Sequence, residues 1–245
     1  MSASFNHLLH WVPDVAKAVY EYNEAGLPAY SVSEPEWFTT EARPGYIEVI
    51  SIQDRASVFV ATPFETDEPL TDAARSTVDA GGGALNFGVS VEDTTPVAER
   101  WRSLGLDVRE FTVAPEGAPV SWRLATITDG PPWAPFAVAY DPPRDKLFDV
   151  MAEQGTPLAP LWPYALTIES PTPYSDADWL GQLLELSVEG VIDQPRINLP
   201  GCEIHFRDGA AERIIAVALD GNAGETVPTA TVAGLHYRPA FAETP

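Results

Sequence analysis

A chain of 245 residues, 45% of them hydrophobic, has enough apolar material for one large or two small domains, which excludes a disordered protein. Its 36 acidic and 14 basic residues give a formal charge of −22, which repels phosphate backbones and anionic lipids, so we expect neither nucleic acid nor membrane as a partner. The N-terminus lacks a secretory signal pattern and no apolar run could span a bilayer, which predicts a cytoplasmic protein.

The first segment, residues 1–65, has the pattern of a strand, a helix and further strands. A strand-like stretch runs from His7, Asp14 is suited to cap a helix, and Gly26 is suited to the left-handed position that ends it. The stretch GYIEVISI, residues 45–52, is apolar on both faces of a strand but carries Glu48 at its centre. A buried carboxylate is costly without a partner, so Glu48 is expected to face either a bound group or an arginine such as Arg43 or Arg123.

The second segment, residues 84–141, repeats the first at a shift of 79 residues without a gap. The repeat rests on four identities: Val12 with Val91, Asp14 with Asp93, Gly26 with Gly105 and Leu27 with Leu106. Further extended stretches follow Gly105, which predicts the order strand, helix and three strands. We expect the acidic stretch between the copies, residues 66–83, to be a linker.

A similar but weaker pattern of a strand, a helix and further strands occupies residues 164–221 and predicts a degenerate third module. It follows a Pro-rich connection, residues 142–163, and precedes a C-terminal strand and tail, residues 222–245. The lone cysteine, Cys202, is expected to be a small core residue. Alternation places Glu203 and His205 on the opposite face of the same strand, where a solvent-facing pair is favoured over a site.

The order and spacing of three stretches resemble the vicinal oxygen chelate superfamily, in particular its glyoxalase-like branch that includes bleomycin-resistance-like proteins. These stretches are FNHLLHWVPD at the N-terminus, GYIEVISI, and the restart near Asn86 with WRLATIT and PFAVAYD. The resemblance implies an α+β fold in which βαβββ modules pair so that their curled mixed sheets enclose a cleft. It covers residues 5–141 and, more weakly, 164–220.

The resemblance also implies where a site would lie. Members often hold a divalent metal through one residue on the first strand and one on the last strand of each module, and His7 and Glu48 match the two positions of the first module. In the second module Asn86 matches the first position, and Val138 or Ala139 matches the last. A metal such as Zn, Ni, Mn, Fe or Mg would therefore meet an incomplete site. The residues assigned to substrate binding are Asn86, Trp122, Arg123, Phe136 and Tyr140.

Two functions stay open at this point. The first is a glyoxalase-like isomerase, lyase or cyclase that acts on a small carbonyl- or oxygen-bearing metabolite, with Glu48 as the catalytic base and metal assistance where the site permits it. The alternative is a non-catalytic small-molecule-binding or drug-sequestering protein, which needs no complete metal site. The odd third module would allow a homodimer.

Overall fold

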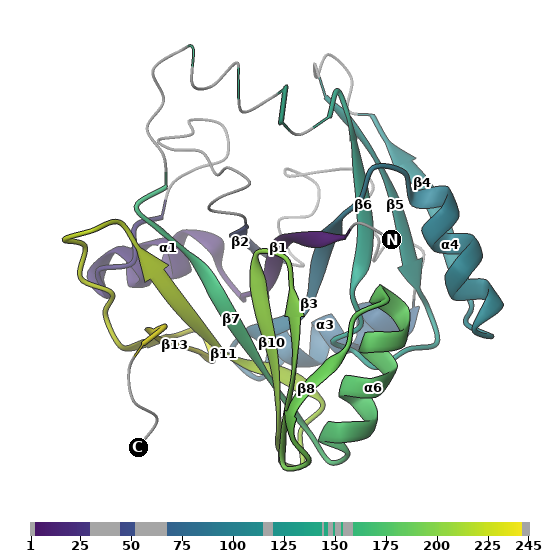
Figure 1. Cartoon of the computed structure of the whole chain (residues 1–245). Helices are drawn as coiled ribbons and strands as arrows, with labels where there is room; N and C mark the ends of the chain where they lie inside the picture. Colours follow the sequence, from purple (N-terminus) through teal and green to yellow (C-terminus); the bar gives the residue numbers. More distant parts are fainter. Residues whose placement is uncertain are drawn as a thin grey trace.

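The computed structural model describes residues 3–29, 45–51, 68–114, 120–143, 145–146, 149, 153 and 159–241. Its first half contains β1 (Ser4–Trp11), α1 (Val15–Glu24), β2 (Tyr46–Ile50), α3 (Glu68–Asp79), β3 (Gly83–Ser90), α4 (Thr94–Ser103), β4 (Val108–Val113), β5 (Ser121–Ile127) and β6 (Phe136–Asp141). Its second half contains β7 (Leu161–Ser170), α6 (Pro173–Leu184), β8 (Val188–Val191), β9 (Gln194–Leu199), β10 (Cys202–Asp208), β11 (Arg213–Gly221), β12 (Ala230–Val232) and β13 (Leu235–Pro239). The mixed α+β class predicted from the sequence is confirmed (Figure 1).

The strands of the described part form one mixed sheet with a repeated pattern. We call the segments β1–β2, β3–β6, β7–β10 and β11–β13 units. The first and last strands of each unit pair in parallel, as β1 with β2, β3 with β6, β7 with β10, and β11 with β13. The units meet through antiparallel pairs, β1 with β3 and β7 with β11, and Ile214 of β11 pairs with Ala84 of β3. Parallel first and last strands place residues from both ends of a unit side by side on one face of the sheet.

Local sequence explains how the repeated helices begin and where their chains turn. The side chain of Asp14 accepts a hydrogen bond from the Lys17 amide at 2.9 Å, and Asp93 accepts one from the Thr95 amide at 3.0 Å. After the helices, Gly26 and Gly105 have φ angles of 75° and 89°, as the sequence predicts.

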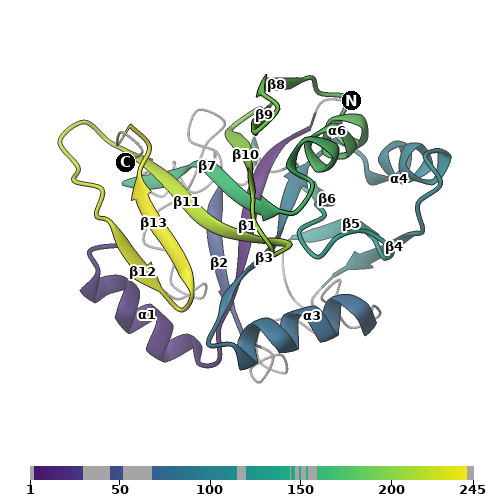
Figure 2. The same ribbon diagram turned by 90° about the horizontal axis from the view of Figure 1, so that it is seen from below.

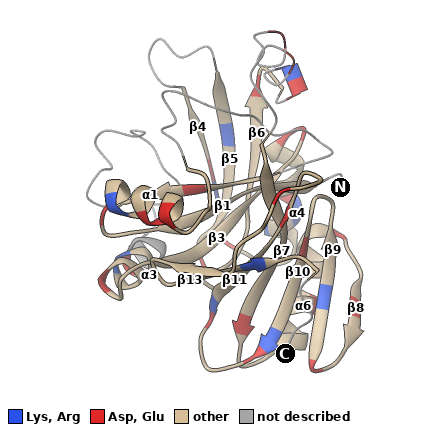
Figure 3. Cartoon of the chain, turned by 90° about the vertical axis from the view of Figure 1, so that its left-hand side faces the viewer, with Lys and Arg blue, Asp and Glu red and all other residues tan. Residues whose placement is uncertain are grey.

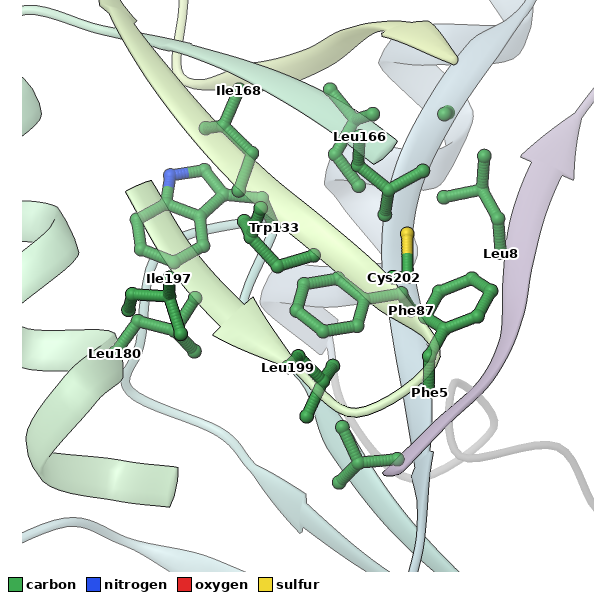
Figure 4. Close-up of a cluster of buried hydrophobic side chains, with 14 of the residues drawn as sticks. Phe5, Leu8, Phe87, Trp133, Leu166, Ile168, Leu180, Ile197, Leu199 and Cys202 are labelled. Atoms are coloured by element: carbon green, nitrogen blue, oxygen red, sulfur yellow. The ribbon is translucent and has the colours of Figure 1, made fainter. Parts of the chain in front are cut away.

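The main core packs side chains of α4, of α6 and of α1 (Tyr22) against the sheet. Figure 4 shows side chains from distant segments meeting there, and Trp133, Phe206 and Leu180 are almost completely buried. Cys202 belongs to this core, as predicted, and burial raises the pKa of its thiol far above the ordinary range. Figure 2 shows α1 and α3 on another side of the molecule, where α1 contacts β12 and α3 contacts β1 and β3.

Two features differ from the sequence-based expectations. Part of the stretch expected to be a linker forms α3, Glu68–Asp79, whose Ala74 and Val78 pack in a second core with Leu9 and Trp11. The strand that appeared covered on both faces, β2, runs from exposed at Tyr46 to half-buried at Ile50. One of the further strands expected in the first segment, near residues 36–42, lies outside the described residues. No helix in the described part is long and apolar enough to cross a bilayer.

Candidate functional site

His7 and Glu48 come together on adjacent parallel strands. His7 pairs with Tyr46 across β1 and β2, and its Nε2 lies 3.5 Å from Oε2 of Glu48. The imidazole stacks on the Tyr46 ring, with centroids 4.9 Å apart, and meets the edge of the Phe136 ring at 5.3 Å. The sequence-predicted pair is therefore assembled, and two aromatic rings hold the histidine in place.

Asn6, which the sequence analysis missed, fixes the chemistry of the His7 ring. Its Oδ1 lies 2.6 Å from His7 Nδ1 and also accepts a hydrogen bond from the Tyr140 hydroxyl at 3.2 Å. Because a carbonyl oxygen only accepts, the neutral His7 ring carries its proton on Nδ1 and presents the Nε2 lone pair toward Glu48. The ladder between β1 and β3 is irregular from Phe5 to His7, and this bulge lets neighbouring side chains meet.

Glu48 has an environment suited to acid–base chemistry. Its side chain keeps 28% of its surface exposed, yet desolvation by the surrounding protein raises its pKa from 4.5 to about 7. A carboxyl group with this pKa exchanges protons readily near neutral pH. Arg123, one of the ion-pair partners considered for Glu48, pairs instead with Asp93 at 3.0 Å. Arg43 lies outside the described residues.

The register of the second unit corrects one sequence-based assignment. Glu48 lies opposite Leu9, and the residue 79 positions after Leu9 is Gly88, which lies opposite Phe136. Phe136, and neither Val138 nor Ala139, therefore holds the last-strand position of the second module. The sequence left the register of PFAVAYD open, because the segment between the first and the last strand is longer in the second module than in the first. A Cβ added at Gly88 would lie 3.0 Å from both His7 and Phe136, so glycine provides the space for their contact.

Comparison with known proteins identifies the family of the chain. The model of the family described as "Glyoxalase-like domain" matches residues 5–167, which is more than half of the chain. The chain belongs to the glyoxalase-like domain family. The resemblance to the vicinal oxygen chelate superfamily that the sequence predicts is thereby confirmed.

Solved structures similar to this glyoxalase-like protein share its fold. A hypothetical protein from Staphylococcus aureus matches with a TM-score of 0.71 and 12% identity, over 97% of this chain and 98% of that one. The E323L mutant of homoprotocatechuate 2,3-dioxygenase from Brevibacterium fuscum matches with a TM-score of 0.53 and 10% identity. The alignment covers 88% of this chain but 56% of the dioxygenase, so the present chain spans little more than half of that enzyme. No functionally curated protein matches the sequence.

The four positions where the superfamily resemblance implies metal ligands hold His7, Glu48, Asn86 and Phe136 in this glyoxalase-like protein. A phenyl ring donates nothing to a metal, and Asn86 offers an amide oxygen, which is buried and has no hydrogen-bond partner in the described part of the chain. No group of three or more His, Cys, Asp and Glu residues that could hold a metal occurs among the described residues. The set does not fit a four-ligand centre.

The remaining predicted substrate-binding residues divide between the two faces of the sheet. Phe136 packs with Leu124 and Val138 in the second core, and Trp122 and Tyr140 lie half-buried against that core. Arg123 follows Trp122 in the strand and therefore points to the opposite face. The structure brings Trp122, Phe136 and Tyr140 onto the face of His7 and separates Arg123 from them.

A metal titration tests the incomplete donor set. We expect zinc to leave the melting temperature of the chelator-treated wild-type protein unchanged, and Asn86→His to gain a zinc-dependent rise because it supplies a second imidazole. Binding to the native state alone stabilises it by about 2.7 kcal/mol at a ligand concentration 100 times Kd. Differential scanning fluorimetry measures the shift, and Asn86→His/Glu48→Gln should lose it. An equal rise in the wild-type protein would show that its own donors suffice.

Proposed function

We propose that this glyoxalase-like protein is an enzyme that moves a proton on a small carbonyl-bearing metabolite, with Glu48 as the general base. The observation that carries the proposal is the position of Glu48, partly exposed, with a pKa of about 7 and 3.5 Å from His7 Nε2. An isomerase, a lyase or a cyclase that acts on a carbonyl compound can begin with such a proton transfer. The small-molecule partner, the homodimer and the cytoplasmic location remain predictions.

The residues suggest a simple sequence of events. The Glu48 carboxylate removes a proton from the carbon beside the substrate carbonyl, and the electrons of the broken C–H bond move to the carbonyl oxygen to give an enolate. The protonated Glu48 can then donate a hydrogen bond to the Nε2 lone pair of His7, which Asn6 keeps available. When the substrate is an α-hydroxy carbonyl compound, the hydroxyl proton moves to the enolate oxygen and Glu48 returns its proton to the former carbonyl carbon, which completes an isomerisation. When a leaving group is attached to the carbon next to the deprotonated one, its departure with the bonding electron pair completes an elimination.

The alternative is a binding protein, and one observation favours it. Asn86 and Phe136 occupy two of the four ligand positions of the family, which suits a protein that holds a molecule without activating it through a metal. A binder, however, has no use for a carboxyl group whose pKa lies near neutrality beside an oriented imidazole. We therefore favour the enzyme.

Solvent deuterium exchange tests the proposal without knowledge of the product. We expect the wild-type protein in D₂O to speed the exchange of protons beside the carbonyl in members of a panel of small ketones and aldehydes, because the base shares its proton with solvent. Proton NMR measures the loss of the signal against a buffer control. Compounds that bind, as judged by ligand-observed NMR, but exchange at the buffer rate would support the binding protein instead.

A further inference from the structure

We propose that the Tyr140 hydroxyl is a positioning group for the proton transfer and acts through Asn6 on the His7 ring. In this role it keeps the Nε2 lone pair of His7 available to Glu48. The inference deepens the proposed function and rests on it, because it concerns the same base. It follows from the direction of the hydrogen bonds at Asn6, from the burial of that side chain and from the neutral character of the strands around it.

Two donors converge on one oxygen of Asn6. The Oδ1 atom accepts a hydrogen bond from His7 Nδ1 at 2.6 Å and another from the Tyr140 hydroxyl at 3.2 Å. A carbonyl oxygen has two lone pairs, so these two donors fill it. The Asn6 side chain is buried, and its Nδ2 has no hydrogen-bond partner in the described part of the chain. The orientation of the amide group therefore depends on the two bonds to Oδ1.

The Tyr140 hydroxyl opposes rotation of this amide group. Turned by 180°, Asn6 would present its NH₂ group to His7 Nδ1, and the neutral ring would then carry its proton on Nε2. The same rotation would present an N–H group to the Tyr140 hydroxyl, whose own proton would lose its acceptor. Without the hydroxyl, each orientation of the amide makes one hydrogen bond, to His7, so the two ring tautomers come closer in free energy. One neutral hydrogen bond shifts such an equilibrium about fivefold.

The tautomer of His7 affects the state that follows the proton transfer. His7 Nε2 lies 3.5 Å from Glu48 Oε2, so a bare Nε2 can accept a hydrogen bond from the protonated carboxyl group. A protonated Nε2 would instead donate to the carboxylate and stabilise the base before the reaction, and it would leave protonated Glu48 facing an N–H group. The Nδ1 tautomer therefore favours the state in which Glu48 has taken the proton.

The strand β6 supports the His7 ring at two points. Phe136 meets the edge of the ring, with centroids 5.3 Å apart, and Tyr140, four residues further on the same face of β6, reaches Asn6. The strands β1 and β6 contain no Lys or Arg, and their ribbons show no blue in Figure 3. These two strands therefore offer Asn6 no charged donor, whose stronger hydrogen bond would outweigh that of a hydroxyl.

The tautomer can be observed directly, because the chain contains four histidines. Long-range ¹H–¹⁵N NMR spectra of histidine-labelled protein distinguish a protonated ring nitrogen from a bare one, and His7→Gln assigns the His7 signals. We expect the wild-type ring to carry its proton on Nδ1, and Tyr140→Phe to shift the tautomer ratio about fivefold toward Nε2. Tyr164→Phe removes a hydroxyl that donates to Glu203 at 3.3 Å, in another unit, and should leave the His7 signals unchanged. A wild-type ring protonated on Nε2, or an unchanged ratio in Tyr140→Phe, would overturn the inference.

A double-mutant cycle shows whether the hydroxyl acts through Asn6. Tyr140→Phe should slow the deuterium exchange of a ketone found in the panel about fivefold, with the dissociation constant of that ketone within about twofold of the wild-type value. In the Asn6→Ala background the same change should alter the rate by less than about twofold, because the connecting oxygen is absent. Equal slowing in both backgrounds would place the effect of Tyr140 elsewhere and contradict the inference. If the tautomer shifts but the wild-type protein exchanges no ketone, the proposed function fails and the role of Tyr140 toward His7 stands.

Discussion

Glu48→Gln should abolish proton exchange while leaving ligand binding within about twofold of the wild-type protein. The amide has nearly the same shape as the carboxyl group but cannot accept a proton at any working pH, and removal of a general base costs roughly 10²- to 10⁴-fold in rate. The measurement is the deuterium exchange rate of a substrate found in the ketone panel, with its dissociation constant determined on the same sample. Retained exchange would remove Glu48 from the role of base.

The pH dependence of the reaction rate also tests the role of Glu48. A base with a pKa of about 7 is ionised above that pH, so kcat/KM of the wild-type protein should rise with pH and level off above about pH 7.

The stability of the protein should also depend on the protonation of Glu48. Its folded-state pKa is raised above the ordinary 4.5, so the folded state binds the proton more tightly than the unfolded state. This contribution to stability is lost as pH rises from about 4.5 through 7. Glu48→Gln should therefore gain melting temperature relative to the wild-type protein at pH 8 more than at pH 5.

Glu203 provides a matched control for this experiment. Its carboxylate lies 2.7 Å from His205 Nε2 and accepts a hydrogen bond from the Tyr164 hydroxyl, so it too is a half-buried Glu–His pair. It lies on β10, in another unit of the sheet, and Glu203→Gln should leave both the exchange rate and its pH profile unchanged. A loss of exchange in this variant would place the reacting group in the second half of the chain.

The parts of the fold that depend on local sequence were predictable. The caps at Asp14 and Asp93 and the left-handed glycines that follow the two helices were all expected, because each depends on residues within one turn of the chain. The helix α3 was not expected, because its sequence is acidic and polar over most of its length and its apolar contact depends on Leu9 and Trp11, far away in sequence.

The site was predictable only in part, and the errors have physical causes. His7 and Glu48 could be paired because the family pattern points to both of them. Assigning Trp122 and Arg123 to one site was inconsistent with strand alternation, which alone separates neighbours onto opposite faces. Alternation would also separate Asn6 from His7, but a bulge in β1 brings their side chains together. No feature of the sequence marked this bulge.

A buried hydrogen-bond chain secures the strand that carries His7. Burial lowers the pKa of His10 to about 4, so its ring is neutral, and its Nε2 donates to the Ala233 carbonyl at 3.0 Å. Its Nδ1 must then accept from the Tyr22 hydroxyl, at 2.6 Å, and the Tyr22 oxygen in turn accepts from Tyr237. Burial raises the pKa of both tyrosines, so both hydroxyls keep their protons. The chain connects β1, α1 and β13.

Tyr22→Phe should destabilise the protein more than Tyr237→Phe, although each removes one hydroxyl from the same chain. Loss of the Tyr22 hydroxyl leaves both His10 Nδ1 and the Tyr237 hydroxyl buried without a partner, at a cost of about 3 kcal/mol, or roughly 6–12 °C in melting temperature. Loss of the Tyr237 hydroxyl removes a donor but leaves the bond from Tyr22 to His10 intact, which should cost about 1 kcal/mol. Tyr20→Phe, at a side chain that is 64% exposed on the same helix, should change nothing measurable. Urea denaturation of the four proteins measures the differences, and equal losses in the two buried variants would contradict the assignment of Tyr22 as the middle hydroxyl that serves both His10 and Tyr237.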